Sequence, residues 1–124
     1  MQRNCPWSPS GGGGASPIRN ERIRSIALYI QEHYSEDLTL DRLCQQFFIS
    51  KSHLITCFKD TTCMTPNEYL ITVRIMKSRE YLKAGVSVVK TCELIGYNDE
   101  SHFIRTFKRI VGITPKQYGK LYAE

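Results

Sequence analysis

Residues 92–118 read CELIGYNDESHFIRTFKRIVGITPKQY, and residues 44–69 read CQQFFISKSHLITCFKDTTCMTPNEY. The two stretches match at an offset of 48 residues at first and of 49 residues after the turn. The matching pairs are Cys44 with Cys92, Ser52-His53 with Ser101-His102, Phe58-Lys59 with Phe107-Lys108, Thr65-Pro66 with Thr114-Pro115, and Tyr69 with Tyr118. Two repeats of this length indicate a duplicated supersecondary unit, because a solenoid needs three or more repeats.

Each repeat predicts a helix, a tight turn, a second helix and then a third helix. In the first repeat, Thr39 and Ser50 are suited to cap the first two helices, the second over about 51–61. The run Thr65-Pro66-Asn67-Glu68 combines a capping box with a proline at the first helical position. It predicts a third helix that ends near Lys83.

The second repeat follows the same order. Ser87 is suited to cap its first helix, and Asn98 or Asp99 to cap a second helix over 99–111. The run Thr114-Pro115-Lys116-Gln117 opens the last helix. The turn before the second helix contains Gly96, whereas the first repeat has Phe48 at the matching position.

An apolar stripe at helical spacing precedes the first repeat. Its members are Ile23, Ile26, Ala27, Ile30 and Tyr34. No segment alternates between apolar and polar residues as a half-buried strand does. We therefore expect an all-α fold of seven helices, with two helix-turn-helix subdomains joined by a long linker helix.

The composition changes after residue 17. Residues 1–17 hold four consecutive glycines and three of the five prolines, which predicts a flexible leader or linker. Whether this segment is native or added is left open. We expect one folded domain over 18–124, made of a first unit (18–65), the linker helix (66–84) and a second unit (85–124).

The charge permits a polyanionic partner. The chain has 124 residues, and 17 Lys and Arg against 12 Asp and Glu give a net charge of +5. No apolar run approaches the roughly 18 residues of a membrane span, and no secretion signal opens the sequence. We therefore expect a cytoplasmic protein that is not associated with a membrane.

The five cysteines include no C-x-x-C pair, which favours reduced thiols. His53 and Cys57 lie one helical turn apart, but a zinc site needs about four ligands. We predict no metal and no cofactor. An enzyme is not expected either, because the sequence has no Ser-His-Asp set, no paired carboxylates and no nucleotide loop.

Helical periodicity predicts which side chains each second helix exposes. Over 51–61, Leu54, Cys57 and Phe58 point inward and Ser52, Thr56 and Lys59 point outward. Over 99–111, Phe103, Thr106, Phe107 and Ile110 point inward and Ser101, Arg105 and Lys108 point outward. The outward side chains of both helices are polar or basic, the types that contact base edges and phosphates.

The helix between the two motifs has a suitable length for DNA. The 18 residues Pro66–Lys83 span about 27 Å at 1.5 Å per residue. With the width of the motifs added, this helix could set two recognition helices one duplex turn, about 34 Å, apart. One chain would then occupy two successive major grooves.

The segment 86–122 resembles the signature of the AraC/XylS family of bacterial transcription regulators. The resemblance is carried by the runs Cys92–Tyr97, Ser101-His102-Phe103, Arg105–Arg109, Gly112–Pro115 and by Tyr118. The first repeat matches the more variable half of the family through Leu40, Leu43, Ser50, Leu54, Phe58-Lys59 and Glu68-Tyr69-Leu70. The resemblance covers about residues 20–122. It implies sequence-specific binding to double-stranded operator DNA and regulation of transcription, usually activation through RNA polymerase.

The family pattern also assigns site residues. Its base-reading positions fall on Ser52, Ile55, Thr56, Glu100, Ser101 and Arg105. The positions that we expect to contact phosphates are Ser50, Lys51, Lys59, Asn98, Lys108 and Arg109.

Each assignment has an alternative. Arg105 could contact a phosphate or solvent instead of a guanine edge, and the lysines could be a solvated face. Glu100 could read a cytosine amino group or simply favour the helix start, and Ile55 could offer only a methyl contact to thymine. His53 and His102 are expected to make local contacts, with a DNA role as the alternative.

Two further expectations follow. The family often has glycine where this chain has Phe48, so the first turn should be built differently. We expect this chain to be monomeric, and dimerisation through a preceding N-terminal domain is left open.

A protein-binding module with an incidental basic surface is the function that competes with DNA binding. Salt-sensitive DNA binding would separate the two functions.

Overall fold

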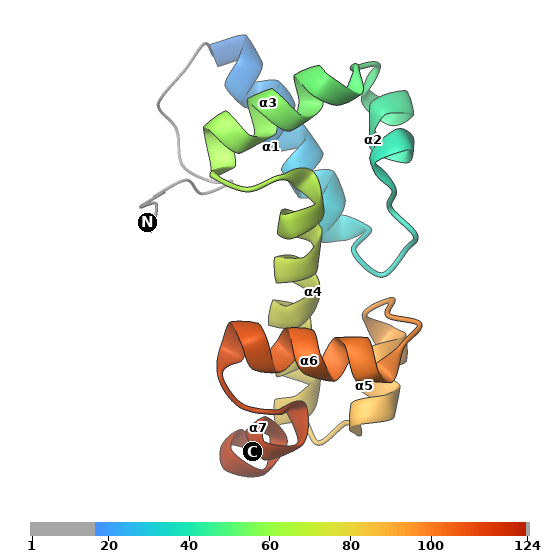
Figure 1. Ribbon diagram of the computed structural model, residues 1–124, viewed down its shortest axis with the longest axis vertical. Helices are drawn as coiled ribbons and strands as arrows, with labels where there is room; N and C mark the ends of the chain where they lie inside the picture. The colour runs from blue at the N-terminus through green and yellow to red at the C-terminus, as the bar shows by residue number, and fades with distance from the viewer. Residues whose placement is uncertain (1–16, 124) are drawn as a thin grey trace. The chain divides into compact units, whose positions relative to one another are not determined.

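The computed structural model describes the backbone of residues 17–123 and the side chains of residues 21–123. Every regular element in this range is an α-helix. The helices are α1 (Pro17–Glu32), α2 (Leu40–Phe47), α3 (Lys51–Thr62), α4 (Pro66–Lys83), α5 (Val88–Leu94), α6 (Glu100–Val111) and α7 (Pro115–Tyr122) (Figure 1). The predicted all-α fold with two helix-turn-helix motifs is confirmed. The leader predicted over 1–17 lies outside the described residues, except for Pro17 at the start of α1.

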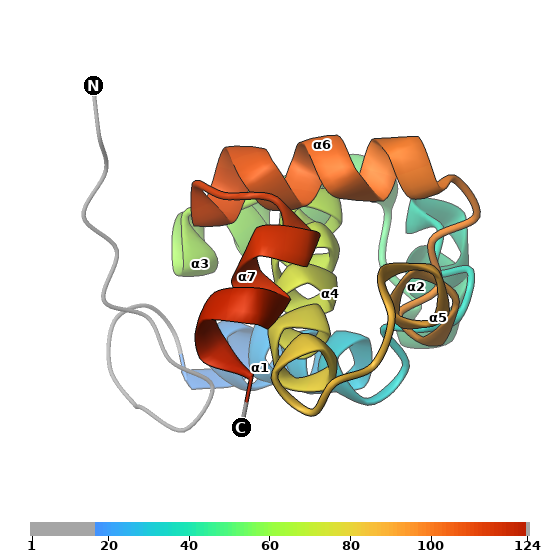
Figure 2. The ribbon, with the colours of Figure 1, turned by 90° about the horizontal axis from the view of Figure 1, so that it is seen from below.

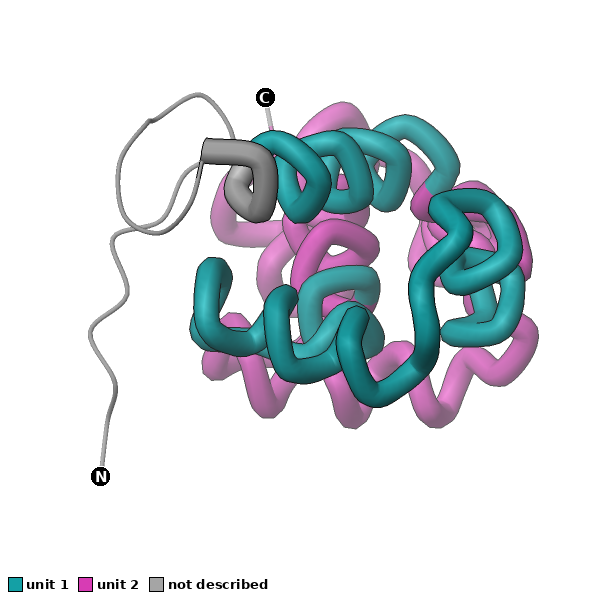
Figure 3. Tube along the Cα trace, turned by 90° about the horizontal axis from the view of Figure 1, so that it is seen from above, with its two compact units in different colours: residues 1–33, 38–70 teal, residues 34–37, 71–124 magenta. Residues whose placement is uncertain are grey.

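The chain divides into two compact units (Figure 3). The first contains the described residues up to His33 together with Leu38–Leu70, and the second contains Tyr34–Asp37 and the chain from Ile71 onward. The boundary between them falls inside α4. Each unit holds one helix-turn-helix motif, α2–α3 in the first and α5–α6 in the second.

The core of the first unit forms where α1 packs against α3. Ile26 and Ile30 on α1 and Leu54 and Phe58 on α3 are all fully buried. The predicted stripe is correct up to Ile30. Tyr34, however, lies beyond the end of α1 and belongs to the second unit, because the helix stops at Glu32.

The second unit has a core of its own, to which each of its four helices contributes. Its buried members are Ile75, Leu82, Cys92, Ile95, Tyr97, Phe103, Phe107 and Tyr118. Phe107 meets both Phe103 and Tyr118 edge-on, with ring centroids 5.9 and 5.6 Å apart. Edge-to-face contacts of this kind add to the burial of apolar area. This core fixes one side of α6 and leaves the other side exposed.

Side-chain caps begin the helices as predicted. The hydroxyl oxygens of Thr39, Ser50 and Ser87 each accept a hydrogen bond from the backbone N–H three residues on. For α6 the cap is Asp99, whose Oδ1 accepts from the N–H of His102 at 3.3 Å. Asn98 is therefore not a cap, because α6 starts at Glu100 and the capping position directly precedes the first helical residue.

The two turns inside the motifs share one backbone hydrogen bond and one left-handed residue. The N–H of Ile49 donates to the carbonyl oxygen of Cys44 at 3.1 Å, and the N–H of Tyr97 donates to that of Cys92 at 3.1 Å. Phe48 has φ 52° and Gly96 has φ 89°, so both are left-handed. The expectation that Phe48 requires a different turn is wrong, because Phe48 adopts the conformation that glycine takes in the second turn.

Candidate nucleic-acid interface

Helix α3 presents a polar face in the first unit. Leu54, Cys57 and Phe58 are at most 4% exposed, which turns the opposite side of the helix to solvent. Ser52 and Thr56 are exposed there. Ile55, which sequence reasoning also assigned to base reading, lies at the edge of this face and is half-buried.

Helix α6 presents the equivalent face in the second unit, where it runs across α4 (Figure 2). Phe103, Thr106 and Phe107 are buried, whereas Glu100, Ser101 and Arg105 are exposed. Within residues 21–123, Arg105 has neither an ion pair nor a side-chain hydrogen bond. Its guanidinium, with five N–H donors, is therefore available to an external acceptor.

Two candidate phosphate contacts lie at the start of α3. The Ser50 hydroxyl accepts from the N–H of His53 at 3.3 Å, so it has a structural role whether or not DNA is bound. The Lys51 ammonium lies 3.0 Å from the Asp41 carboxylate of α2, and this hydrogen bond raises the pKa of Lys51. Both side chains are more than half exposed. An ion pair at this exposure contributes little, so Lys51 can exchange its partner.

The other candidate phosphate contacts are exposed as well. Lys59 lies in the last turn of α3, and Lys108 and Arg109 lie in the last turn of α6. Positive charge at a helix C-terminus interacts favourably with the helix dipole, so these side chains also favour their own helices. Asn98 is exposed two residues before α6.

Both motif histidines make local contacts, as predicted. His53 Nε2 lies 3.4 Å from the sulfur of Cys57, and the His102 ring meets the Tyr97 ring edge-on at 5.4 Å. In the part of the chain with described side chains, no three His, Cys, Asp or Glu residues are grouped to hold a metal ion.

The expectation of reduced thiols is correct for three of the described cysteines. Cys57 and Cys92 are buried free thiols, and Cys44 is a half-buried one. Burial raises the pKa of Cys92, which disfavours its thiolate. Cys63 is disulfide-bonded, so the expectation of a reduced thiol is wrong there. Cys5 lies outside the described residues.

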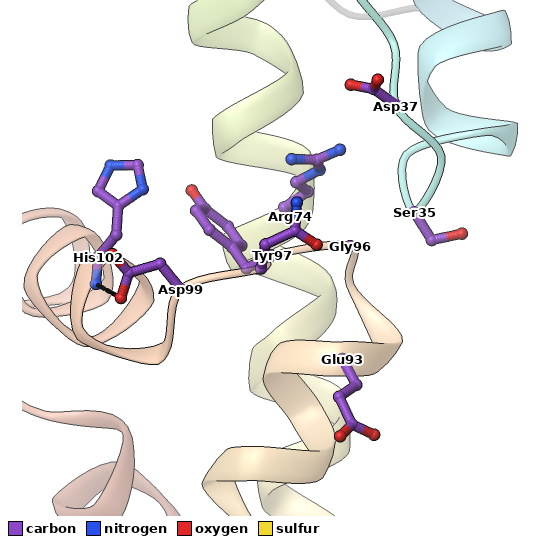
Figure 4. Close-up of a pocket in the computed structure, with 9 residues that line it drawn as sticks. Ser35, Asp37, Arg74, Glu93, Gly96, Tyr97, Asp99 and His102 are labelled. Atoms are coloured by element: carbon purple, nitrogen blue, oxygen red, sulfur yellow. Dashed lines mark hydrogen bonds between the residues drawn. The ribbon is translucent and has the colours of Figure 1, made fainter.

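Two arginines behind the motifs escaped sequence reasoning. Arg22 on α1 donates from Nη2 to the carbonyl oxygens of Phe47 and Phe48, at 2.5 and 2.8 Å, and so holds the first turn. Arg74 on α4 is half-buried and lines an open cavity of about 650 Å³ in the second unit (Figure 4). The sequence contains one signal for Arg74, namely a basic residue between two apolar residues of a predicted helix.

A family model described as a helix-turn-helix domain matches residues 43–120. The chain belongs to the AraC-type helix-turn-helix family. The match begins inside α2, covers the whole of α3 to α6, and ends inside α7. The resemblance seen in the sequence is thereby confirmed for the AraC-type domain.

Similar proteins show the same domain within longer chains. The domain is 30% identical over 115 residues to the raffinose operon transcriptional regulatory protein RafR of Pediococcus pentosaceus, covering 92% of this chain and 42% of RafR. The chain spans between 31% and 63% of the length of the first curated relatives that it matches.

Solved structures share the fold. The C-terminal domain of AraT, a response regulator from Geobacillus stearothermophilus, has a TM-score of 0.81 at 26% identity, covering 90% of this chain and 91% of that domain. The DNA-binding domain of the global transcriptional factor AdpA, solved with a target DNA, has a TM-score of 0.77 at 22% identity, covering 82% and 92%. The AdpA likeness concerns the fold alone.

None of the seven helices described for the AraC-type domain combines the length and the hydropathy that crossing a membrane would require.

Proposed function

We propose that this chain binds a specific sequence in double-stranded operator DNA and activates bacterial transcription. The observation that carries the proposal is the equivalence of the two recognition helices. Ser52 and Lys59 on α3 and their counterparts Ser101 and Lys108 on α6 are all exposed, while the opposite side of each helix is buried. A core-packed helix with an exposed polar face suits the major groove, which is about 12 Å wide.

The residue roles form the second part of the proposal. Ser52, Ile55, Thr56, Glu100, Ser101 and Arg105 contact base edges, and Ser50, Lys51, Lys59, Asn98, Lys108 and Arg109 contact phosphates. Base contacts supply sequence preference, whereas phosphate contacts supply most of the salt-dependent affinity. With Asn98 no longer a cap, its proposed contact rests on its exposed position beside the start of α6.

The two motifs act on successive major grooves, with residues 66–84 as the spacer between the segments 18–65 and 85–124. In this arrangement one chain does the work of a dimer of single motifs, so we propose that this chain binds as a monomer. RNA polymerase is the further partner that activation requires. The proposed setting is the nucleoid in the bacterial cytoplasm, and the role is one of binding and not of catalysis.

Selection from random double-stranded oligonucleotides tests the proposal and returns the operator sequence. We expect enrichment of one bipartite motif. On the selected DNA, the logarithm of the binding constant should fall linearly with the logarithm of the salt concentration, by about 0.9 for each neutralised phosphate. If no sequence were enriched and the retention of DNA did not depend on salt, the result would instead favour the alternative function, a protein-binding module.

A further inference from the structure

Arg74 makes a three-way contact inside the second unit. Its Nε donates to the carbonyl oxygen of Tyr34 at 2.7 Å, and its Nη2 donates to that of Glu36 at 2.8 Å. The Cζ atom of the same guanidinium lies 5.5 Å from the centroid of the Tyr97 ring, a cation–π contact. Figure 4 shows Arg74 extending from α4 beside Tyr97, with Ser35 and Asp37 beyond it.

The segment that Arg74 holds lies directly against the turn of the second motif. A Cβ atom on Gly96 would lie 2.5 Å from the carbonyl oxygen of Ser35, so backbone meets backbone here with no space for a side chain. Arg74 therefore lies at a point where three parts of the second unit meet: the segment 34–37, the turn at Gly96 and the ring of Tyr97. Desolvation at this site lowers the pKa of Arg74, although arginine keeps its charge in proteins.

Tyr97 continues the contact toward the recognition helix. The residue is 8% exposed, and its ring lies 5.4 Å from that of His102 and 5.7 Å from that of Phe103, both in the first turns of α6. Arg105 follows Phe103 by two residues. The position of the Tyr97 ring thus limits where the start of α6 can lie, and with it the proposed base-reading side chains.

We propose that Arg74 is a positioning residue for the second recognition helix. It fixes Tyr97 against the segment 34–37, and Tyr97 fixes the start of α6. Its planar guanidinium suits this role because two donors in fixed directions serve two carbonyl oxygens while the flat face lies on the ring. Loss of Arg74 should therefore reduce sequence discrimination at base pairs read from α6 and leave those read from α3 unchanged. This inference rests on the proposed DNA binding.

The chain offers a matched control in Arg79. Arg79 also lies on α4, is half-buried, and places its Cζ atom 5.6 Å from the ring centroid of Tyr118. Its Nε donates to the Tyr118 hydroxyl at 3.1 Å. Arg79→Met removes the same charge and the same kind of ring contact, but Tyr118 lies on α7 and not in the turn before α6.

The test is a ratio of affinities measured with the whole chain. Dissociation constants for the selected site and its single-base-pair variants give a discrimination ratio for each position, and Arg105→Ala identifies the half read from α6. Unfolding of a fraction of whole molecules changes all affinities by one factor and leaves these ratios unchanged. In Arg74→Met we expect the ratios in the α6 half to fall about 10-fold, the loss of one good base contact.

Arg74→Lys gives a second test, because one ammonium group cannot keep both carbonyl bonds and the ring contact. It should lower the same ratios, whereas Arg79→Met should leave both halves at wild-type values. Unchanged ratios in Arg74→Met and Arg74→Lys, with wild-type discrimination intact, would overturn the inference and leave the proposed function standing. A wild-type chain that discriminates at no position would contradict the proposed function itself.

Discussion

The turns of the two helix-turn-helix motifs each contain a left-handed residue but differ in how that residue is held. In the first, Phe48 adopts φ 52° with its side chain 90% exposed, and Arg22 donates to the carbonyl groups beside it. In the second, Gly96 adopts φ 89° under close contact with Ser35, and Arg74 holds the neighbouring segment. The comparison shows that a left-handed turn tolerates a large residue where its side chain can point into solvent, and requires glycine where backbone covers it.

Gly96→Ala should give the largest effect, because a Cβ atom adds both left-handed strain and overlap with the Ser35 backbone. We expect the free energy of unfolding of the second unit to fall by about 2–4 kcal/mol. Urea unfolding followed by circular dichroism measures the loss, and amide hydrogen exchange assigns it to the second unit.

Gly112→Ala is the control for this substitution. Gly112 has φ 104°, but its Cβ position has no neighbouring atom within 4 Å among the described residues, so only the strain of about 1–2 kcal/mol applies. Equal losses in the two variants would mean that Ser35 does not constrain the second turn.

Arg105→Ala tests base reading by the second motif. We expect a loss of about 1–3 kcal/mol on the selected operator, together with lost preference at one base pair. Thr56→Ala is the comparison in the first motif and should alter preference in the other half of the operator. Competition binding with single-base-pair variants measures both. A uniform loss on every sequence in Arg105→Ala would make Arg105 a phosphate contact.

Lys59→Ala and Lys108→Ala test whether the two motifs contact the DNA phosphates in the same way. Each variant should weaken binding to all sequences by a similar factor. Each should also reduce the slope of log binding constant against log salt by about 0.9, the contribution of one phosphate. Titrations at several salt concentrations give the slopes. If only one variant changes the slope, the two lysines have different roles in spite of their matching positions.

Phe48→Gly should give the smallest effect and have the opposite sign. Relief of the left-handed strain, about 1–2 kcal/mol, exceeds the greater freedom of glycine in the unfolded chain, about 0.5–1 kcal/mol. We expect the free energy of unfolding of the first unit to rise by about 0.5–1 kcal/mol. A clear destabilisation would show that the Phe48 ring makes a stabilising contact that its exposure does not reveal.

Sequence patterns predicted most of the helices because their signals are local. A capping hydroxyl, a proline at the first helical position and an apolar face with helical spacing lie within a few residues of one another, and α4 begins and ends where they indicate. The errors at Tyr34 and Phe48, and the open choice between Asn98 and Asp99, have a different origin. Each depends on where a helix ends or starts, or on which backbone a turn adopts, and these features are decided by the packing around them.

The candidate interface was predictable in part for the same reason. The exposed faces of α3 and α6 follow from periodicity, whereas Arg22 and Arg74 act across 25 to 40 residues of sequence. No local pattern relates Arg74 to Tyr34, since the contact exists only once the segment 34–37 lies against α4. Residues that position a site from behind are thus harder to predict than residues on its surface.

Footprinting of the whole chain on the selected operator tests the central claim most directly. We predict that one molecule protects two major-groove segments whose centres lie about 10 base pairs apart on one face of the duplex. Insertion of five base pairs between them should remove protection of one segment, because half a turn moves it to the opposite face. A single protected segment, or two segments that stay protected after the insertion, would contradict the account.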